Sequence, residues 1–205
     1  IEDFGGMDVL CTDKTGTLTE GVVVLDAAVD PGGRPSAEVL NFAHLNAAFE
    51  TGIDNPLDAA IVAAGERSRL ETTGYRKVDE IPYDFIRKRL TIVVAREGEA
   101  GKHLIITKGA FDTVRAICPV EAELAGRLEA YYRQKGAEGC RVLAVAMKGV
   151  AARDRYGHED ERGMTFAGFL LFFDPPRDDA EKTIHDLAAL GIGIKVITGD
   201  NRYVA

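Results

Sequence analysis

The stretch Asp13-Lys14-Thr15-Gly16-Thr17-Leu18-Thr19-Glu20 decides how the rest of this chain is interpreted. It follows the apolar run Val9-Leu10-Cys11, which predicts a short buried strand. A strand that ends at Asp13 places its carboxylate at the carboxyl edge of a sheet, where open α/β sheets bind their ligands. From that position Asp13 can act as a nucleophile and form a covalent acyl intermediate.

The residues that follow Asp13 suit the binding of an anion. Lys14 supplies a compact positive charge, and Gly16 lets the backbone approach the anion closely. Thr15 and Thr17 offer hydroxyl and backbone N–H groups to phosphate oxygens. The stretch therefore predicts phosphoryl chemistry at this strand end.

The composition is that of an ordinary globular chain, with 205 residues, 46% of them apolar and 28% charged, enough for one large or two modest domains. The net charge of −8 argues against a nucleic-acid partner, because a phosphate backbone attracts basic surfaces. The three cysteines include no Cys-x-x-Cys pair, so neither a disulfide framework nor a zinc site is indicated. No apolar run approaches the roughly 18–20 residues that span a bilayer, so we expect no membrane helix in this segment.

Turn signals and apolar periodicity divide the middle of the chain into helices and strands. Ser36 and Asn55 precede two apolar runs as N-caps, and two β-branched runs around a polar turn predict a hairpin. We expect Lys108-Gly109-Ala110 to end that hairpin and to open a helix that closes near Ile117. The other expected helices are 36–49, 56–66 and 121–135, and the expected strands are 21–25, 90–95, 104–107 and 141–147.

The end of the chain predicts a strand, a helix and a second strand. A polar stretch at 151–163, expected to be a surface excursion, precedes an apolar strand at 165–173. A helix to residue 190 and a short buried strand at 194–197 follow, and the chain then turns at Thr198-Gly199-Asp200. This strand and the one that ends at Asp13 could be neighbours in one parallel sheet. The middle block would then be an insertion that leaves and returns through one pair of linkers.

Four motifs occur along the chain in the order Asp-Lys-Thr-Gly-Thr, Lys-Gly-Ala, Asp-Pro-Pro-Arg and Thr-Gly-Asp. This order resembles the P-type (E1-E2) cation-transporting ATPases, and the likeness covers essentially the whole chain. The resemblance implies an α/β fold in which a haloacid dehalogenase-like, Rossmann-like phosphorylation domain carries an inserted α+β nucleotide-binding domain, an antiparallel sheet flanked by helices. The implied parts are 1–22 and 164–205 for the phosphorylation domain, the second of them truncated, and 23–163 for the nucleotide-binding domain.

The resemblance also implies the catalytic residues. Asp13 corresponds to the phosphorylated aspartate, next to Lys14, and Asp13 and Thr15 would be Mg²⁺ ligands, with further ligands beyond Ala205. Thr198 would hold the γ-phosphate in a loop with Gly199, and Asp200 would orient the nucleotide.

The nucleotide site can be predicted partly from chemistry and partly from the resemblance. An aromatic pair, Tyr83 and Phe85, adjoins the basic run Arg87-Lys88-Arg89, which suits stacking on adenine and contact with a triphosphate. Phe85 could equally be a core residue at a strand entry. The resemblance implies the full set of nucleotide-binding residues, which is Asp58, Tyr83, Phe85, Lys88, Lys108, Gly109, Arg141, Asp174 and Arg177.

The implied function is that of the catalytic fragment of an ATP-driven cation pump. Residues 51–58 and 84–89 are most similar to bacterial magnesium-transport ATPases, so magnesium is the expected ion and ATP with Mg²⁺ the expected cofactors. A proton or calcium pump, a soluble haloacid dehalogenase-like phosphatase and a nucleotide-binding module without chemistry are the alternatives. Those phosphatases carry a second Asp where this chain has Thr15, which favours the pump.

The expected setting follows from the same resemblance. The parent protein would add transmembrane and actuator domains, and this segment would lie at the cytoplasmic face of a membrane, which the resemblance implies is a bacterial inner membrane. The fragment alone is expected to be soluble and to turn over little or no ATP.

Overall fold

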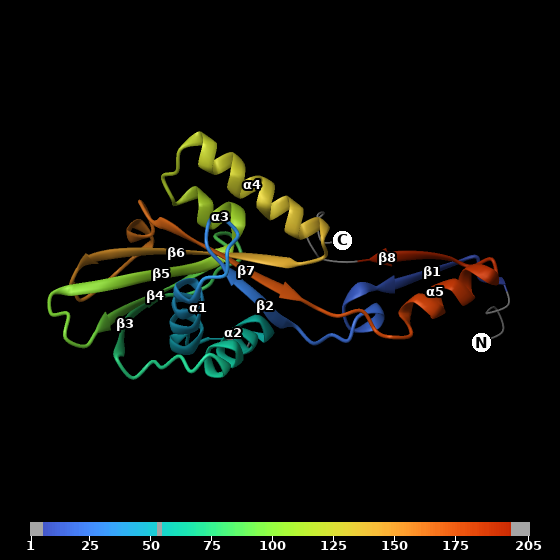
Figure 1. The fold of residues 1–205 in the computed structure, drawn as a ribbon, viewed down its shortest axis with the longest axis horizontal. Coiled ribbons are helices and arrows are strands. Elements are labelled where there is room, and N and C mark those ends of the chain that lie inside the picture. Colours follow the sequence, from blue (N-terminus) through green and yellow to red (C-terminus); the bar gives the residue numbers. More distant parts are fainter. Residues whose placement is uncertain (1–5, 53–54, 198–205) are drawn as a thin grey trace.

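The computed structural model describes residues 6–52 and 55–197. The predicted site residues Thr198, Gly199 and Asp200 lie outside the described residues. Figure 1 shows a larger unit with an antiparallel sheet and a smaller unit formed by β1, β8 and α5. No helix in the described part of the chain is long and apolar enough to cross a membrane.

The larger unit is built on a six-stranded antiparallel sheet with the order β2-β7-β6-β5-β4-β3. The predicted hairpin is confirmed as β4 and β5, which pair along their β-branched residues. The strands are β2 (Val24–Val29), β3 (Tyr75–Ile81), β4 (Arg89–Arg96), β5 (Lys102–Ala110), β6 (Arg141–Ala151) and β7 (Thr165–Phe173).

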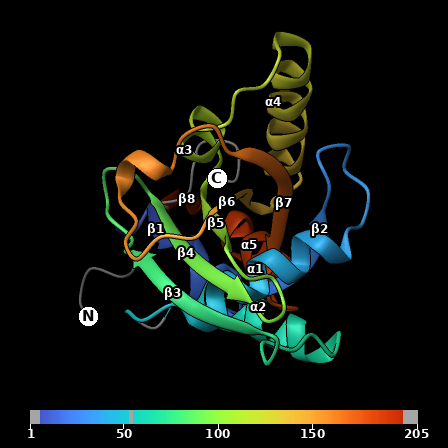
Figure 2. The same cartoon turned by 90° about the vertical axis from the view of Figure 1, so that its left-hand side faces the viewer.

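Helices cover both faces of this sheet, with α1 (Ala37–Phe49) and α2 (Pro56–Arg67) on one face and α3 (Phe111–Ala116) and α4 (Ala122–Ala137) on the other (Figure 2). Because strand residues alternate between faces, the neighbours Ile105 and Ile106 belong to two different cores. Both predicted N-caps are confirmed: the Ser36 hydroxyl accepts from Val39 N at 3.3 Å, and the Asn55 side chain accepts from Leu57 N at 3.0 Å.

The smaller unit confirms that the first and last strands are parallel neighbours. β1 (Val9–Asp13) pairs with β8 (Gly193–Ile197), and Asp13 lies opposite Ile197. The prediction that both strands are buried is wrong, since Val9 in β1 is 45% exposed, and Val196 and Ile197 in β8 are 46% and 64% exposed. The physical reason is that the helix packed on β8, α5 (Ala180–Ala189), is short and has no buried residue of its own. Two strands and a helix are less than the haloacid dehalogenase-like sheet we expected, so that part of the fold stays a prediction.

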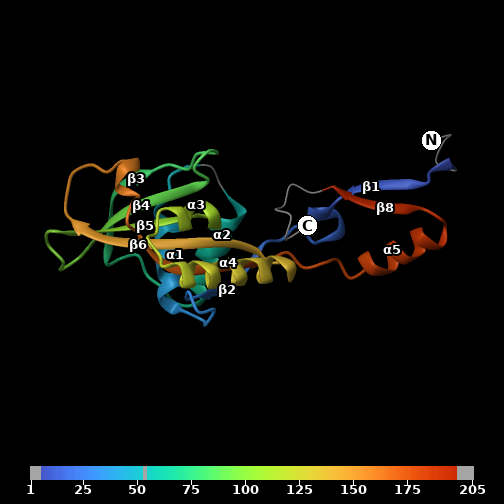
Figure 3. The ribbon, with the colours of Figure 1, turned by 90° about the horizontal axis from the view of Figure 1, so that it is seen from above.

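Two linkers lie side by side between the units, as the insertion topology requires (Figure 3). Glu20 N donates to Pro175 O at 2.9 Å, and Arg177 N donates to Leu18 O at 3.0 Å. The Thr19 hydroxyl donates to the Asp174 carboxylate at 2.7 Å. The chain therefore enters and leaves the larger unit through one hydrogen-bonded pair of segments.

Two expected boundaries differ from the structure. β7, expected to open the second part of the phosphorylation domain at residue 164, pairs with β2 on one side and β6 on the other, so it is a strand of the larger unit. Lys108 and Gly109 do not end the hairpin but continue β5, opposite Leu90 and Arg89. A helix does follow, but it starts only at Phe111, because the pairing with β6 extends to Ala110.

Candidate functional site

A buried lysine between two carboxylates is the central feature of the face covered by α1 and α2. Lys108 is 5% exposed, forms an ion pair with Asp58 in the first turn of α2, and has its Nζ 3.7 Å from Oε2 of Glu50 at the end of α1. Burial lowers the pKa of Lys108 to about 8, although the Glu50 carboxylate acts in the opposite direction. Burial also raises the pKa of Glu50, against the effect of the Lys108 charge. The structure thus brings together Asp58 and Lys108, two residues that the sequence assigned to one site.

A pocket of about 430 Å³ opens beside this cluster. Both the size and the mixed lining fit a small-molecule site, in which a few polar groups orient a ligand against apolar walls. Its walls are Ala47, Glu50, Gly52, Asn55, Pro56, Asp58, Ala59 and Val62.

At Gly109, strands β4 and β5 approach each other too closely to leave room for a side chain. A Cβ at this position would meet the Lys88 carbonyl oxygen and lie 2.6 Å from the Arg89 Cα. Both are backbone atoms, which cannot move aside cheaply. The resemblance assigned Gly109 to nucleotide binding. The structure shows that a glycine is also required at this position by the packing of the two strands.

We therefore expect Gly109→Ala to lower the free energy of unfolding by about 1–3 kcal/mol, as overpacking of a well-packed core does. Urea unfolding followed by circular dichroism measures this loss. Gly149→Ala in β6 is the matched control, because a Cβ there meets nothing within 4 Å. Equal effects of the two substitutions would contradict the packing argument.

The loop between β3 and β4 presents its aromatic residues to solvent. Tyr83 is 48% and Phe85 84% exposed, and their rings meet edge-to-face at 5.6 Å. The alternative that Phe85 is a core residue is therefore wrong. Lys88 ends the loop at a positive φ of 48°, and its carbonyl accepts from Ala110 N at 2.9 Å. That bond joins the loop to the segment that follows Lys108 and Gly109.

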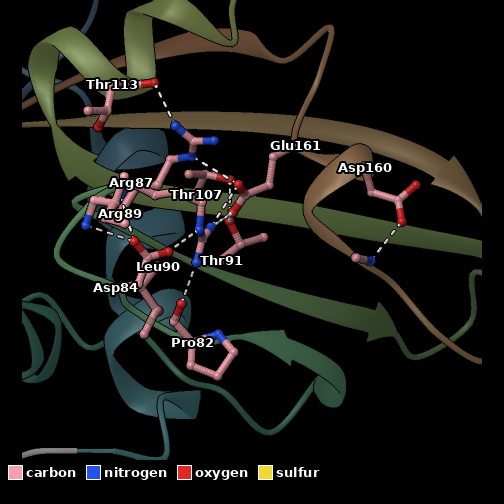
Figure 4. A network of polar contacts seen from close by, with 12 residues as sticks. Pro82, Asp84, Arg87, Arg89, Leu90, Thr91, Thr107, Thr113, Asp160 and Glu161 are labelled. Carbon is pink, nitrogen blue, oxygen red and sulfur yellow. Dashed lines mark hydrogen bonds and ion pairs between the residues drawn. The ribbon is translucent and has the colours of Figure 1, made fainter.

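The two arginines of the basic run are engaged within the protein. Arg87 and Arg89 both donate to the carboxylate of Glu161, which is completely buried (Figure 4). The expectation that 151–163 is only a surface excursion is wrong at this residue. Sequence reasoning missed Glu161 because one acid in a polar stretch gives no periodic signal; two arginines at the entry to an apolar strand were the available hint.

The turn after β1 is closed by its own side chains. Asp13 is exposed at the strand end, and Gly16 adopts a positive φ of 76° within the turn Lys14–Leu18. The Gly16 N–H donates to the Thr19 hydroxyl at 3.1 Å, which is the hydroxyl that also contacts Asp174. The exposed Asp13 and Thr15 fit the role of oxygen donors to a hard cation. Within residues 6–52 and 55–197, no three histidine, cysteine, aspartate or glutamate side chains group closely enough to hold a metal.

Three further predicted residues lie apart from the Lys108 pocket. Asp174 accepts from Thr19 and from Gly21 N at 3.0 Å, so its carboxylate joins the two linkers. Arg177 donates to Asp179 at 3.2 Å, and the exposed Arg141 begins β6. None of the three lines the pocket.

Comparison with known proteins identifies the family of this chain. A family model described as P-type ATPase, cytoplasmic domain N, matches residues 36–179, which span the larger unit from α1 to the second linker. The chain belongs to the P-type ATPase family. This P-type ATPase segment includes α1, α2 and β3–β7 in the matched range, and β1 with its Asp-Lys-Thr-Gly-Thr turn precedes that range.

Its relatives are transport ATPases. The chain is 37% identical to the Magnesium-transporting ATPase, P-type 1, of Salmonella typhimurium and 36% identical to the protein of the same name from Escherichia coli strain K12. Both matches cover 100% of this chain and 24% of the relative, so the chain spans about a quarter of the length of the curated relatives.

Proposed function

We propose that the larger unit binds Mg-ATP and that the γ-phosphoryl group is transferred to Asp13, as one step in the cycle of an ATP-driven cation pump. The observation that carries this proposal is the pair of hydrogen-bonded linkers, because they attach the larger unit within a few residues of Asp13. A nucleotide held by the larger unit can then be brought to the carboxylate by a rotation at the linkers. Thr198, Gly199 and Asp200, which follow β8 in the sequence, are proposed to complete the phosphate site.

The proposed nucleotide site uses the pocket beside Lys108 and the loop between β3 and β4. Asp58 and Lys108 would fix the base or the adjoining polar groups, since both are buried and can pair with polar ligand atoms. The exposed rings of Tyr83 and Phe85 would stack on the adenine, and Lys88 would approach the phosphates. Gly109 keeps the loop close to β5, and Arg141, Asp174 and Arg177 are proposed to make nucleotide contacts once the units close.

The proposed reaction is an in-line displacement at the γ-phosphorus. One carboxylate oxygen of Asp13 forms a bond to phosphorus as the bond to the β–γ bridging oxygen breaks, and ADP leaves with that oxygen and its charge. Lys14 supplies positive charge at the turn, and Asp13 and Thr15 supply oxygen ligands for Mg²⁺, which neutralises charge on the phosphates. Thr15 replaces the acid that would activate water, so the acyl phosphate persists long enough to drive a conformational step.

We further propose magnesium as the transported ion, because the relatives named above are magnesium-transporting ATPases. A proton or calcium pump is the alternative within the family. The parent protein would carry transmembrane and actuator domains, with this segment at the cytoplasmic face of a bacterial inner membrane.

Titration of the ¹⁵N-labelled chain with Mg-ATP tests the nucleotide site. We expect the NMR shift changes to cluster on Asp58, Tyr83, Lys88 and Lys108. The Lys88→Ala variant should bind about tenfold more weakly, the amount expected for one charge-assisted hydrogen bond to a phosphate. Lys102→Ala is the matched control, because Lys102 is an exposed lysine at the start of β5, and Lys88 lies near the end of that strand. Shift changes confined to other surfaces, or equal affinities of the two variants, would exclude the proposed site.

A further inference from the structure

One completely buried carboxylate, that of Glu161, accepts several hydrogen bonds and belongs to no residue assigned above to a ligand. Glu161 is 0% exposed and accepts hydrogen bonds on both oxygens. Arg87 Nη1 lies 2.7 Å from Oε1 and 2.8 Å from Oε2, Arg89 Nε lies 2.9 Å from Oε2, and the Thr91 hydroxyl lies 2.7 Å from Oε1. A buried acid with two guanidinium partners is stable only while all its partners are in place.

Glu161 is held from a part of the chain that does not belong to the loop between β3 and β4. The preceding turn is closed by Asp160, whose backbone N donates to Gly157 O at 2.9 Å and whose carboxylate accepts from Gly157 N at 3.0 Å. After it, Met164 N donates to Ile117 O at the end of α3 at 3.0 Å. These hydrogen bonds on either side fix the position of Glu161 independently of the loop between β3 and β4.

Arg87 connects Glu161 to the loop between β3 and β4. Its guanidinium donates to Glu161, to the Asp84 carboxylate and to the Pro82 carbonyl oxygen, the last at 2.6 Å (Figure 4). Asp84 in turn accepts from the backbone N–H groups of Ile86 at 2.8 Å and Arg87 at 2.7 Å. The loop backbone is thus wrapped around one guanidinium group, and that group is docked on Glu161.

The residues of this loop that face solvent gain little stability from packing. Tyr83 is 48%, Phe85 84% and Ile86 91% exposed, so burial contributes little to their positions. Lys88 has a positive φ of 48°, a conformation that a residue other than glycine keeps only where its surroundings enforce it. Within the loop, the hydrogen bonds to Arg87 and Asp84 are the contacts that can hold Lys88 in this conformation.

We propose that Glu161 is a positioning residue of the nucleotide site: by holding Arg87, it fixes the loop that presents Tyr83, Phe85 and Lys88. This inference rests on the proposed function for its ligand, Mg-ATP. It adds that affinity for the nucleotide is set partly from the opposite face of the sheet, through a residue that does not touch the ligand.

The test is a double-mutant cycle with Glu161→Gln and Arg87→Met, with Glu159→Gln as the control because Glu159 is an exposed acid in the same segment. Glu161→Gln should speed hydrogen exchange at the Ile86 and Arg87 amides about tenfold, while the amides of the buried residues Ile92 and Ile106 stay protected. The same variant should weaken Mg-ATP binding about tenfold. Glu159→Gln should change neither quantity.

The cycle separates positioning from general loss of structure. In the Arg87→Met background, Glu161→Gln should cause no further loss of affinity, although it should still lower stability through Arg89. Equal loss of affinity in both backgrounds, or unchanged loop exchange and affinity in Glu161→Gln, would overturn the proposal. If Glu161→Gln does not fold, Arg87→Met decides alone, because Glu161 then keeps Arg89 and Thr91 and the loop should still be released. If the wild-type chain binds no Mg-ATP, the proposed function fails, and the exchange rates still decide whether Glu161 positions the loop.

Discussion

In the full-length protein, Asp13→Asn should form no acid-stable phosphoenzyme from ATP, and its ATPase rate should fall by roughly 10³-fold or more. The carboxamide has almost the shape of the carboxylate but lacks the charged oxygen that attacks the γ-phosphorus. Asp13 is exposed at the end of β1, so the substitution removes no buried contact and should leave stability nearly unchanged. Incorporation of ³²P from labelled ATP, followed by acid precipitation, measures the phosphoenzyme directly.

Asp8→Asn is the matched control for this experiment. Asp8 is also exposed and directly precedes β1, but it lies at the opposite end of the strand from the Asp-Lys-Thr-Gly-Thr turn. This control should form the phosphoenzyme at the wild-type level. Fast hydrolysis of small phosphomonoesters by the wild type, without a phosphoenzyme, would favour the soluble phosphatase instead of the pump.

Replacing Lys108 by Met should lower the free energy of unfolding by about 3–5 kcal/mol near neutral pH, the cost of removing one partner of a buried ion pair. The methionine fills a similar volume, so the loss comes from electrostatics and not from a cavity. Asp58 and Glu50 are left with side chains that are only 12% and 14% exposed and without the lysine that pairs with them. Urea unfolding followed by far-UV circular dichroism measures the effect, and Lys102→Met at the exposed end of β5 is the control.

The effect of Lys108→Met should depend on pH in a definite direction. Burial already raises the pKa of Glu50 in the wild type, and loss of the Lys108 charge raises it further. At mildly acidic pH the folded variant therefore binds more protons than its unfolded chain, and its stability relative to the wild type recovers as the pH falls. A penalty that is the same at about pH 8 and about pH 5.5 would show that the carboxylates are not the cause.

Local sequence signals were sufficient wherever a single segment determines its own structure. Ser36 and Asn55 were identified as helix N-caps because a side-chain oxygen at that position bonds to an N–H group two or three residues later. The hairpin of β4 and β5 was identified from two β-branched runs and a polar turn, all within a short span. One long-range pairing, that of β1 with β8, was also anticipated, because two strands that are each followed by a phosphate-binding motif could share one sheet edge.

The errors arose where distant segments meet. Lys108 was expected at a break in the chain but continues β5, because β4 and β6 supply hydrogen-bond partners on both sides. The strand 165–173 was assigned to the phosphorylation domain from its place in the order of motifs, although its pairing with β2 and β6 decides which unit it joins. The basic run Arg87-Lys88-Arg89 was expected to contact a triphosphate, because the Glu161 carboxylate that pairs with its two arginines is more than 70 residues away in the sequence.

The sequence by itself determined the order of the four motifs and hence the family, and it predicts that Asp13, at a strand end followed by a glycine-containing turn, is the nucleophile. Short-range order suffices there, because a strand end, a glycine and a few hydroxyl groups act through adjacent atoms. Only the tertiary structure decided which charges are paired within the protein. Burial places Lys108 between Asp58 and Glu50 and commits Arg87 and Arg89 to Glu161, since a charge removed from water must find its partner wherever the fold brings one.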